Sequence, residues 1–250
     1  IASSGSFSRR ELSPFSDIDV MFIISSEGDY SKSIQSIIAN AWDAGLEISH
    51  TIREIKDIEN FFVDDLHTFT QFFETRFLSG DKSVYEKWEA SLFDFLNRCS
   101  ETSVVEDFID DAGLRYNKYG SSAKVIEPNV KLSAGGLRDF QLLEWIYIVK
   151  EKKSLSKENA LTQAEIFINI LRENNYTSAK ECNRLFEGYS FILSVRHLLH
   201  LNHNEKSDRL EFDDQIKLAK LFGFKKEGYR KFMKRYFESS NVIYRYSKSF

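Results

Sequence analysis

The sequence predicts an α+β protein in which a small mixed sheet is followed by an all-helical bundle. Strand-like apolar patterns are confined mainly to residues 1–55, which we expect to form the core of the sheet. Only two prolines interrupt the 250 residues, so few helices are forced to break. The 22 phenylalanines supply large apolar surfaces for packing helices together. We expect a sheet-bearing domain at 1–140 and a helical domain at 141–250.

Two strand patterns flank one helix pattern near the N-terminus. Residues 17–24 form an apolar run that opens with two alternating aspartates. Because apolar side chains occupy both faces of this run, we predict a central, covered strand. Residues 34–42 repeat apolar positions at helical spacing, and Gly45 ends that helix. Residues 46–53 alternate again and predict a second strand beside the first.

Beyond residue 55 the apolar period becomes helical. We expect one helix over 62–78 and another that opens with a capping box at 83–86. Residues 117–136 contain a proline, three glycines and a Val-Ile pair, which indicates an extended segment plus a loop. Within it, we expect residues 124–131 to add a late strand to the first sheet. From residue 137 onward nearly the whole chain is predicted to be helical.

Composition restricts the class of protein. The formal net charge of −4 and the pI near 5.8 argue against a protein that coats nucleic acid. No apolar run approaches the ~20 residues that a membrane span needs. Cys99 and Cys182 have neither metal-ligand nor redox spacing, which is typical of a reducing compartment. We therefore expect a cytoplasmic protein that binds neither nucleic acid nor membrane.

Three carboxylates near the N-terminus form a candidate metal site. Asp17 and Asp19 are two positions apart on a predicted strand, so both carboxylates project from one face. A divalent cation would relieve their mutual repulsion, and ligation by oxygen alone favours Mg²⁺ or Mn²⁺. Glu47 lies between two apolar residues of the next strand pattern and would supply a third carboxylate. We predict that these three residues are catalytic and hold two cations roughly 3.5–4 Å apart.

The segment upstream of these carboxylates has groups suited to a triphosphate. Gly5 lets the backbone approach phosphate oxygens closely, and the Ser6 hydroxyl and nearby N–H groups can bind them. Arg9 and Arg10 are near enough in sequence to help neutralise a leaving pyrophosphate. We predict that these four residues bind nucleotide. The chain opens at Ile1 without methionine, so we expect a piece whose first strand lies partly upstream.

Other polar residues are expected to be structural. His197, His200 and His203 drift around the axis of their predicted helix, and no carboxylate completes a metal set with them. Lys131, Arg138 and Asp139 flank the loop that contains Gly135 and Gly136 (the glycine loop). They could contact phosphates or tie the helical part to the sheet, and we favour the tie. Each part of the candidate site is also ambiguous by itself, because acidic pairs often begin strands. Only the order and spacing of the parts favour chemistry.

One long segment resembles a known active-site signature. Residues 5–19, GSFSRRELSPFSDID, are similar to the signature of the DNA-polymerase-β-like nucleotidyltransferases, and more narrowly to that of the bacterial PII uridylyltransferases. Three later segments resemble that family's blocks in the same order: QFFETRFLSGD at 71–81, EPNVKLSAGGLRDFQ at 127–141 and LLHLNHNEKSDRLEFDDQ at 198–215. The resemblance implies a polymerase-β-like nucleotidyltransferase domain followed by a helical bundle.

The resemblance also implies an activity. It is transfer of UMP from UTP to a tyrosine of the PII signalling protein, with Mg²⁺ and release of pyrophosphate, in nitrogen regulation. The same resemblance gives metal-binding roles to Asp17, Asp19 and Glu47. The family usually has glycine where Ser6 and Ser8 stand, so the fit to the nucleotide can differ. The sequence contains no His-Asp dipeptide of the kind found in the family's uridylyl-removing domain, so the resemblance is to the transferase portion.

Three other functions fit parts of the pattern. A sister enzyme would adenylylate another protein, such as glutamine synthetase. A catalytically silent regulatory module would bind a nucleotide or protein, although such a module would not need all three carboxylates. A glycosyltransferase would use the Asp-x-Asp pair with Mn²⁺ and a sugar nucleotide, but its site would not need the upstream Gly-Ser turn.

Overall fold

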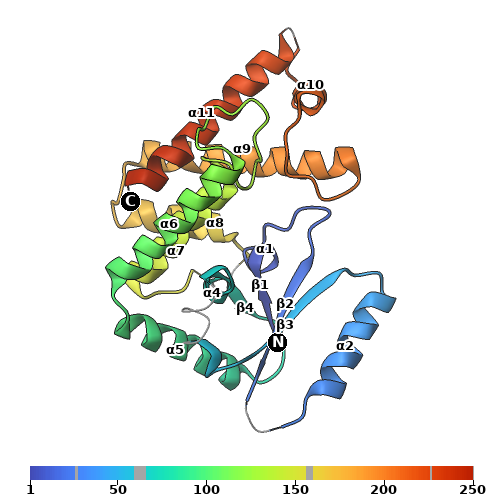
Figure 1. Cartoon of the computed structure of the whole chain (residues 1–250), viewed down its shortest axis with the longest axis vertical. Helices are drawn as coiled ribbons and strands as arrows, with labels where there is room; N and C mark the ends of the chain where they lie inside the picture. Colours follow the sequence, from blue (N-terminus) through green and yellow to red (C-terminus); the bar gives the residue numbers. More distant parts are fainter. Residues whose placement is uncertain (26–27, 59–65, 156–159, 226, 250) are drawn as a thin grey trace. The chain divides into compact units, whose positions relative to one another are not determined.

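The computed structural model describes residues 1–25, 28–58, 66–155, 160–225 and 227–249. Its helices and strands fall into two compact units (Figure 1). The first unit comprises Ile1–Leu12, Ser16–Val105 and Tyr147–Gln163, and the second comprises Ser13–Phe15, Glu106–Ile146 and Ala164–Phe250. The chain therefore passes between the units several times, whereas the sequence suggested a single boundary near residue 140.

The first unit contains a four-stranded mixed sheet with the strand order β3-β2-β1-β4. Its strands are β1 (Ala2–Ser4), β2 (Ile18–Ile24), β3 (Ile48–Glu54) and β4 (Thr75–Phe77). Strands β2 and β3 are parallel, with Ile18 opposite Ile48. Strand β1 is antiparallel to both β2 and β4. The small mixed sheet and the central position of β2 are confirmed.

Helix α2 (Ser31–Asp43) connects β2 to β3 and packs on one face of the sheet. The buried contact is formed by two strand residues and two helix residues, Val20, Phe22, Ile34 and Ile38. Because side chains alternate along a strand, Asp19 lies on the opposite face of β2. The strand-helix-strand order predicted over residues 17–53 is therefore confirmed, and it fixes which face carries the acidic residue.

The other described helices of the first unit are α1 (Gly5–Ser8), α4 (Leu66–Phe73) and α5 (Lys82–Arg98). Aromatic rings pack α4 against α5, with Phe72 and Trp88 at 4.9 Å and Phe69 and Phe95 at 5.7 Å between ring centroids. All four side chains are buried. The prediction that the phenylalanines pack helices together is confirmed here.

Two details of the predicted helices are wrong. Residues 75–77 form β4 instead of continuing the helix expected over 62–78, because they pair with β1. Residues 62–65 of that expected helix lie outside the described residues. The cap of α5 is Asp81, whose carboxylate accepts a hydrogen bond from the backbone N of Ser83 at 2.9 Å. Ser83 therefore lies inside the helix and does not begin it.

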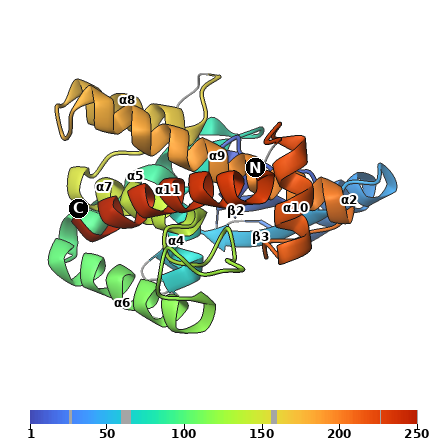
Figure 2. The same cartoon turned by 90° about the horizontal axis from the view of Figure 1, so that it is seen from above.

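The second unit is built from helices. They are α6 (Glu101–Tyr119) and α7 (Leu137–Glu151), each mostly in this unit, α8 (Gln163–Glu173), α9 (Ala179–His203), α10 (Phe212–Leu221) and α11 (Gly228–Ser249). Helices α9, α10 and α11 pack on one another, and Figure 2 shows them grouped together. Phe140 of α7 stacks on Tyr189 of α9 with ring centroids 4.0 Å apart. None of the described helices is long and apolar enough to cross a membrane.

The strand expected over residues 124–131 does not join the sheet. Asn129 forms an isolated antiparallel bridge with Arg209, and the backbone N of Val130 donates to the carbonyl of Asp208 at 2.7 Å. Both partners belong to the second unit. The β-preference of the Val-Ile pair did not decide the outcome, because strand preference depends on which partner strand is available.

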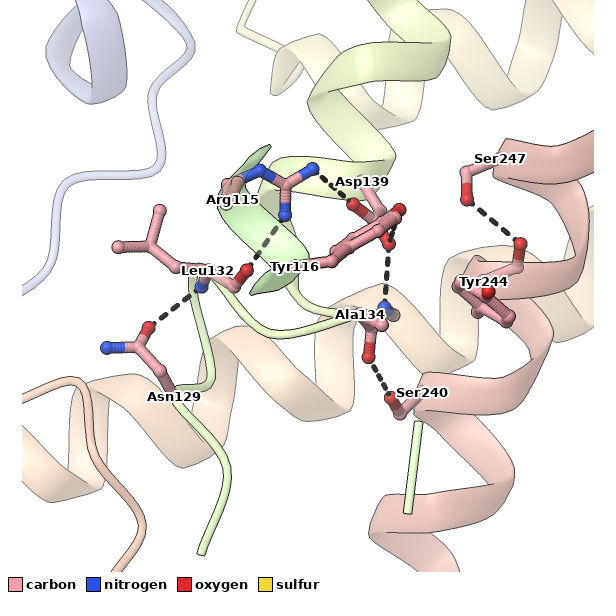
Figure 3. Close-up of polar contacts among 10 residues, drawn as sticks. Arg115, Tyr116, Asn129, Leu132, Ala134, Asp139, Ser240, Tyr244 and Ser247 are labelled. Carbon is pink, nitrogen blue, oxygen red and sulfur yellow. Dashed lines mark hydrogen bonds and ion pairs between the residues drawn. The ribbon is translucent and has the colours of Figure 1, made fainter. Parts of the chain in front are cut away.

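Asp139 ties together three parts of the second unit (Figure 3). Its fully buried carboxylate accepts hydrogen bonds from Arg115 Nη2 at 2.6 Å, Tyr116 Oη at 2.9 Å and the backbone N of Gly135 at 2.7 Å. Burial, together with the charge of Asp139, raises the pKa of Tyr116, so its phenol stays protonated and donates. Asp139 therefore has a structural role, but it joins α6, α7 and the glycine loop, so the tie to the sheet that we favoured is wrong for this residue.

Gly135 packs so closely on α11 that no side chain fits. Its φ is +75°, and an added Cβ would lie 2.2 Å from the carbonyl oxygen of Ser240. Gly223 is a matched control in the same unit, with φ +78° and nothing within 4 Å of an added Cβ. We expect Gly135→Ala to lower the free energy of unfolding by about 1–3 kcal/mol more than Gly223→Ala, because only Gly135→Ala adds a collision to the backbone strain. Urea unfolding measures both losses, and equal losses would contradict this packing.

Candidate functional site

The turn at Gly5 follows β1 directly and opens the short helix α1. Gly5 has φ +55°, and its carbonyl accepts a hydrogen bond from the N of Arg9 at 3.0 Å. The carbonyl of Ser6 accepts from the N of Glu11 at 2.9 Å. The cap residue Ser4 makes no side-chain bond to the N–H groups that begin the helix. The sequence between Gly5 and Glu11 therefore closes into a tight turn at the end of β1.

The carboxylate of Asp19 lies against this turn. An added Cβ on Gly5 would be 2.9 Å from Asp19 Oδ2. The contact arises because β1 and β2 run antiparallel, with Ser3 opposite Val20, so the end of β1 lies beside the beginning of β2. Glycine allows the backbone to come this close, and it adopts this positive φ without the steric cost that a side chain would add. The structure thus brings together two of the residues predicted for the site.

Asp17 precedes β2 by one residue, and both it and Asp19 are half-buried. The start of β2 is held beside the start of β3 by a hydrogen bond of 2.9 Å from the N of Ile18 to the carbonyl of Glu47. The parallel register places Glu47 level with Asp17, and its side chain is exposed. The backbone therefore brings the three acidic positions to one end of the β2–β3 pair.

The side chains do not gather into a closed metal centre. Among the residues that the structure describes, no three His, Cys, Asp or Glu side chains are grouped closely enough to hold a metal ion. The chemistry of the donors still fits a hard cation, because Mg²⁺ is commonly held by one or two carboxylates, waters and substrate phosphates. Asp17 and Asp19 supply that number. Glu47 is not assembled with them.

Arg9 is occupied inside the first unit. Its Nε lies 3.2 Å from Glu11 Oε2, and its Nη1 contacts Glu74 Oε2. All three side chains are buried. The prediction that Arg9 binds phosphate is therefore not supported by its position, which is that of a charge joining α1 to the residue before β4. The sequence could not reveal this, because Glu74 is 65 positions away.

Arg10 and Arg76 are two further cations beside the turn. Arg10 has φ +60°, is half-buried, and donates Nη1 to the carbonyl of Leu161 at 3.2 Å. Arg76 of β4 donates to the carbonyls of Ser8 at 3.4 Å and Phe7 at 3.3 Å. Burial lowers the pKa of Arg76, and the nearby charge of Arg10 lowers it further. Sequence reasoning missed Arg76, whose only signal is its place in the segment FETRF.

This chain is similar in sequence to one family of known proteins. A family model described as GlnD PII-uridylyltransferase matches residues 104–250. A protein of Haemophilus influenzae (strain 86-028NP), named bifunctional uridylyltransferase/uridylyl-removing enzyme, is 30% identical over 248 residues, which is 96% of this chain and 27% of that protein. Proteins of the same name from Nitrosococcus oceani and Ruegeria pomeroyi are 30% identical over 240 residues and 29% identical over 253 residues.

The extent of these matches decides what they show. The Nitrosococcus match covers 91% of this chain and 24% of that protein, and the Ruegeria match covers 97% and 26%. The chain thus spans about a quarter of the length of these curated relatives. The family model, by contrast, matches more than half of the 250 residues. On that match, the chain belongs to the GlnD PII-uridylyltransferase family.

Proposed function

We propose that this chain is the transferase part of an enzyme that moves UMP from UTP to a tyrosine hydroxyl of a PII-type signalling protein, with Mg²⁺ or Mn²⁺. The observation that carries the proposal is the contact between the Gly5 turn and the carboxylate of Asp19. A turn for phosphate oxygens beside carboxylates for a cation is what a metal-bound nucleoside triphosphate requires. The names of the relatives support uridylyl as the transferred group.

The turn is the proposed phosphate-binding element. Gly5 lets the backbone approach the β- and γ-phosphates, and Ser6 contributes its hydroxyl and its N–H. Arg10 adds positive potential for the leaving pyrophosphate. Arg76 lies close enough for the charge of Arg10 to lower its pKa, so the two cations lie near each other. Because Arg9 is buried with Glu11 and Glu74, we assign it to holding the turn instead.

The acidic residues are the proposed metal ligands. Asp17 and Asp19 would hold the cation, which supplies charge neutralisation on the phosphates when it is bound. Glu47 is exposed and level with Asp17. On this proposal its side chain would join the set when the cation binds and would take the proton of the acceptor hydroxyl. In the transfer, the tyrosine oxygen forms a bond to the α-phosphorus while the bond from that phosphorus to the bridging oxygen breaks. Pyrophosphate keeps that oxygen and its electron pair.

The rest of the chain is compatible with a small nucleotide and a protein acceptor. The net charge of −4 gives no general attraction for a nucleic-acid polymer. A cytoplasmic location and a role in nitrogen regulation are parts of the same proposal, and both follow from the family and not from the geometry.

Loss of either aspartate tests the metal site. We expect Asp17→Asn and Asp19→Asn each to reduce transfer of labelled UMP by about 100-fold or more, because a metal ligand supplies several kcal/mol to the transition state. Asp43→Asn, an exposed change at the end of α2, is the matched control and should keep full activity. The assay uses a PII protein, Mg²⁺ and each of the four nucleoside triphosphates in turn.

Each outcome of this assay has a defined meaning. Normal transfer by Asp17→Asn and Asp19→Asn would refute the metal assignment. Transfer from ATP alone would refute uridylyl transfer and favour the adenylylating alternative. If the unaltered chain neither transfers any nucleotide nor binds Mg²⁺–UTP in calorimetry, the proposal is wrong and the silent regulatory module replaces it.

The close approach at Gly5 gives a second test. Gly5→Ala would place a Cβ 2.9 Å from Asp19 Oδ2, whereas Gly45→Ala, at φ +77° in the same unit, meets nothing within 4 Å. We expect Gly5→Ala to reduce kcat/KM for UTP by about tenfold or more, since displacing the carboxylate or the turn weakens transition-state binding. Gly45→Ala should leave kcat/KM within about twofold. Similar values for the two variants, both shown to be folded by circular dichroism, would contradict the proposed contact.

A further inference from the structure

One short segment joins the two halves of the proposed site. Residues Ser13–Phe15 follow the turn that Glu11 closes on Ser6, and they precede Asp17 by a single residue. This segment nevertheless belongs to the second unit. The chain therefore leaves the first unit after the turn and returns to it just before the aspartates.

The segment is held by two buried residues of α9. Arg196 donates Nη1 to Ser13 Oγ at 2.9 Å, and the backbone N of Phe15 donates to His200 Nδ1 at 3.3 Å. Arg196 and His200 are four positions apart and so lie on the same side of the helix. His200 is fully buried and Arg196 is 5% exposed. These two side chains form the anchor of the segment, and the anchor is therefore shielded from water on the side of the helix.

Asp208 orients both anchoring side chains. Its Oδ1 accepts from Arg196 Nε at 2.6 Å and lies 3.6 Å from His200 Nε2. Burial lowers the pKa of His200, and the charge of Arg196 lowers it further, while Asp208 acts in the opposite direction. A neutral imidazole leaves Nδ1 able to accept from Phe15 and puts the proton on Nε2, on the side of Asp208.

We propose that Arg196 and His200 are positioning residues that fix the conformation of Ser13–Phe15, the segment that leads into Asp17 and Asp19. They act through Ser13–Phe15 and touch neither nucleotide nor metal. Successive Cα atoms are about 3.8 Å apart, so a segment fixed at Phe15 leaves the Cα of Asp17 within about 7.6 Å of it. The inference rests on the proposed function, because it assigns a role in that reaction.

The test replaces the acceptor and then restores it. His200→Leu removes the nitrogen that accepts from Phe15, whereas His200→Asn keeps an acceptor oxygen near the position of Nδ1. His197→Leu is the matched control, since it is a half-buried histidine one turn earlier on the same helix. Hydrogen exchange at residues 13–19, kcat and KM for UTP, and the melting temperature are measured for each variant.

We expect His200→Leu to speed exchange at Phe15 and to lower kcat by about tenfold, with a smaller change in KM, because the segment that leads into the metal ligands loses its anchor while the phosphate turn does not. His200→Asn should recover most of both effects, and His197→Leu should show neither. A lower melting temperature for His200→Leu with unchanged exchange at residues 13–19 and unchanged kcat would overturn the proposal. So would a His200→Asn variant no better than His200→Leu.

Two provisions keep the test decisive. If His200→Leu does not fold, Ser13→Ala removes the acceptor of Arg196 from the segment itself and is expected to give the same pattern more weakly. If the unaltered chain shows no transfer, the proposed function fails on its own account. Exchange still decides the anchor in that case: faster exchange at residues 13–19 in His200→Leu but not in His197→Leu supports it, and equal exchange overturns it.

Discussion

The close approach of Gly5 to the carboxylate of Asp19 is the constraint on which the proposed site depends. It requires an antiparallel β1–β2 pair, so that one strand ends where the other begins. It also requires a residue without Cβ, since an added Cβ would lie 2.9 Å from Asp19 Oδ2. The apolar contact of β2 with α2 then decides that the aspartate lies on the opposite face. Each of these features is simple, but the site exists only where all of them coincide.

The turn is supported by charges that come from distant parts of the sequence. Glu74 and Arg76 lie on either side of Thr75, and they contact Arg9 and the carbonyls of α1 respectively. The edge strand β4 therefore does more than extend the sheet, because Arg76 within it and Glu74 just before it carry the groups that orient α1 and Arg9. In the second unit, Asp139 performs a comparable task for the glycine loop, with its buried carboxylate satisfied by three donors. Such fully paired buried carboxylates specify one arrangement of the chain.

Local patterns account for what the sequence predicted well. Three patterns predicted β2, α2 and β3: the alternation in residues 17–24, the helical spacing before Gly45 and the alternation after it. These predictions succeeded because the elements pack on partners that are close to them in sequence. Partners remote in sequence account for what was missed. The local pattern of residues 75–77 predicts a helix, but in the fold they pair with β1. The local sequence around Arg9 predicts a phosphate ligand, but in the fold Arg9 contacts Glu74. The Gly-Ser turn and the aspartate pair could be proposed from the sequence because they belong to one short motif. Glu47 lies on another strand, and the sequence does not show how closely its side chain approaches the two aspartates.

The central claim is that Asp17 and Asp19 hold the cation of a nucleotide whose phosphates lie on the Gly5 turn. Anomalous X-ray diffraction from crystals grown with Mn²⁺ and a non-hydrolysable UTP analogue locates both directly. The account predicts an anomalous peak within coordination distance, about 2.0–2.2 Å, of an oxygen of each aspartate, with the triphosphate against Gly5 and Ser6. A nucleotide-bound Mn²⁺ that contacts neither carboxylate would contradict it.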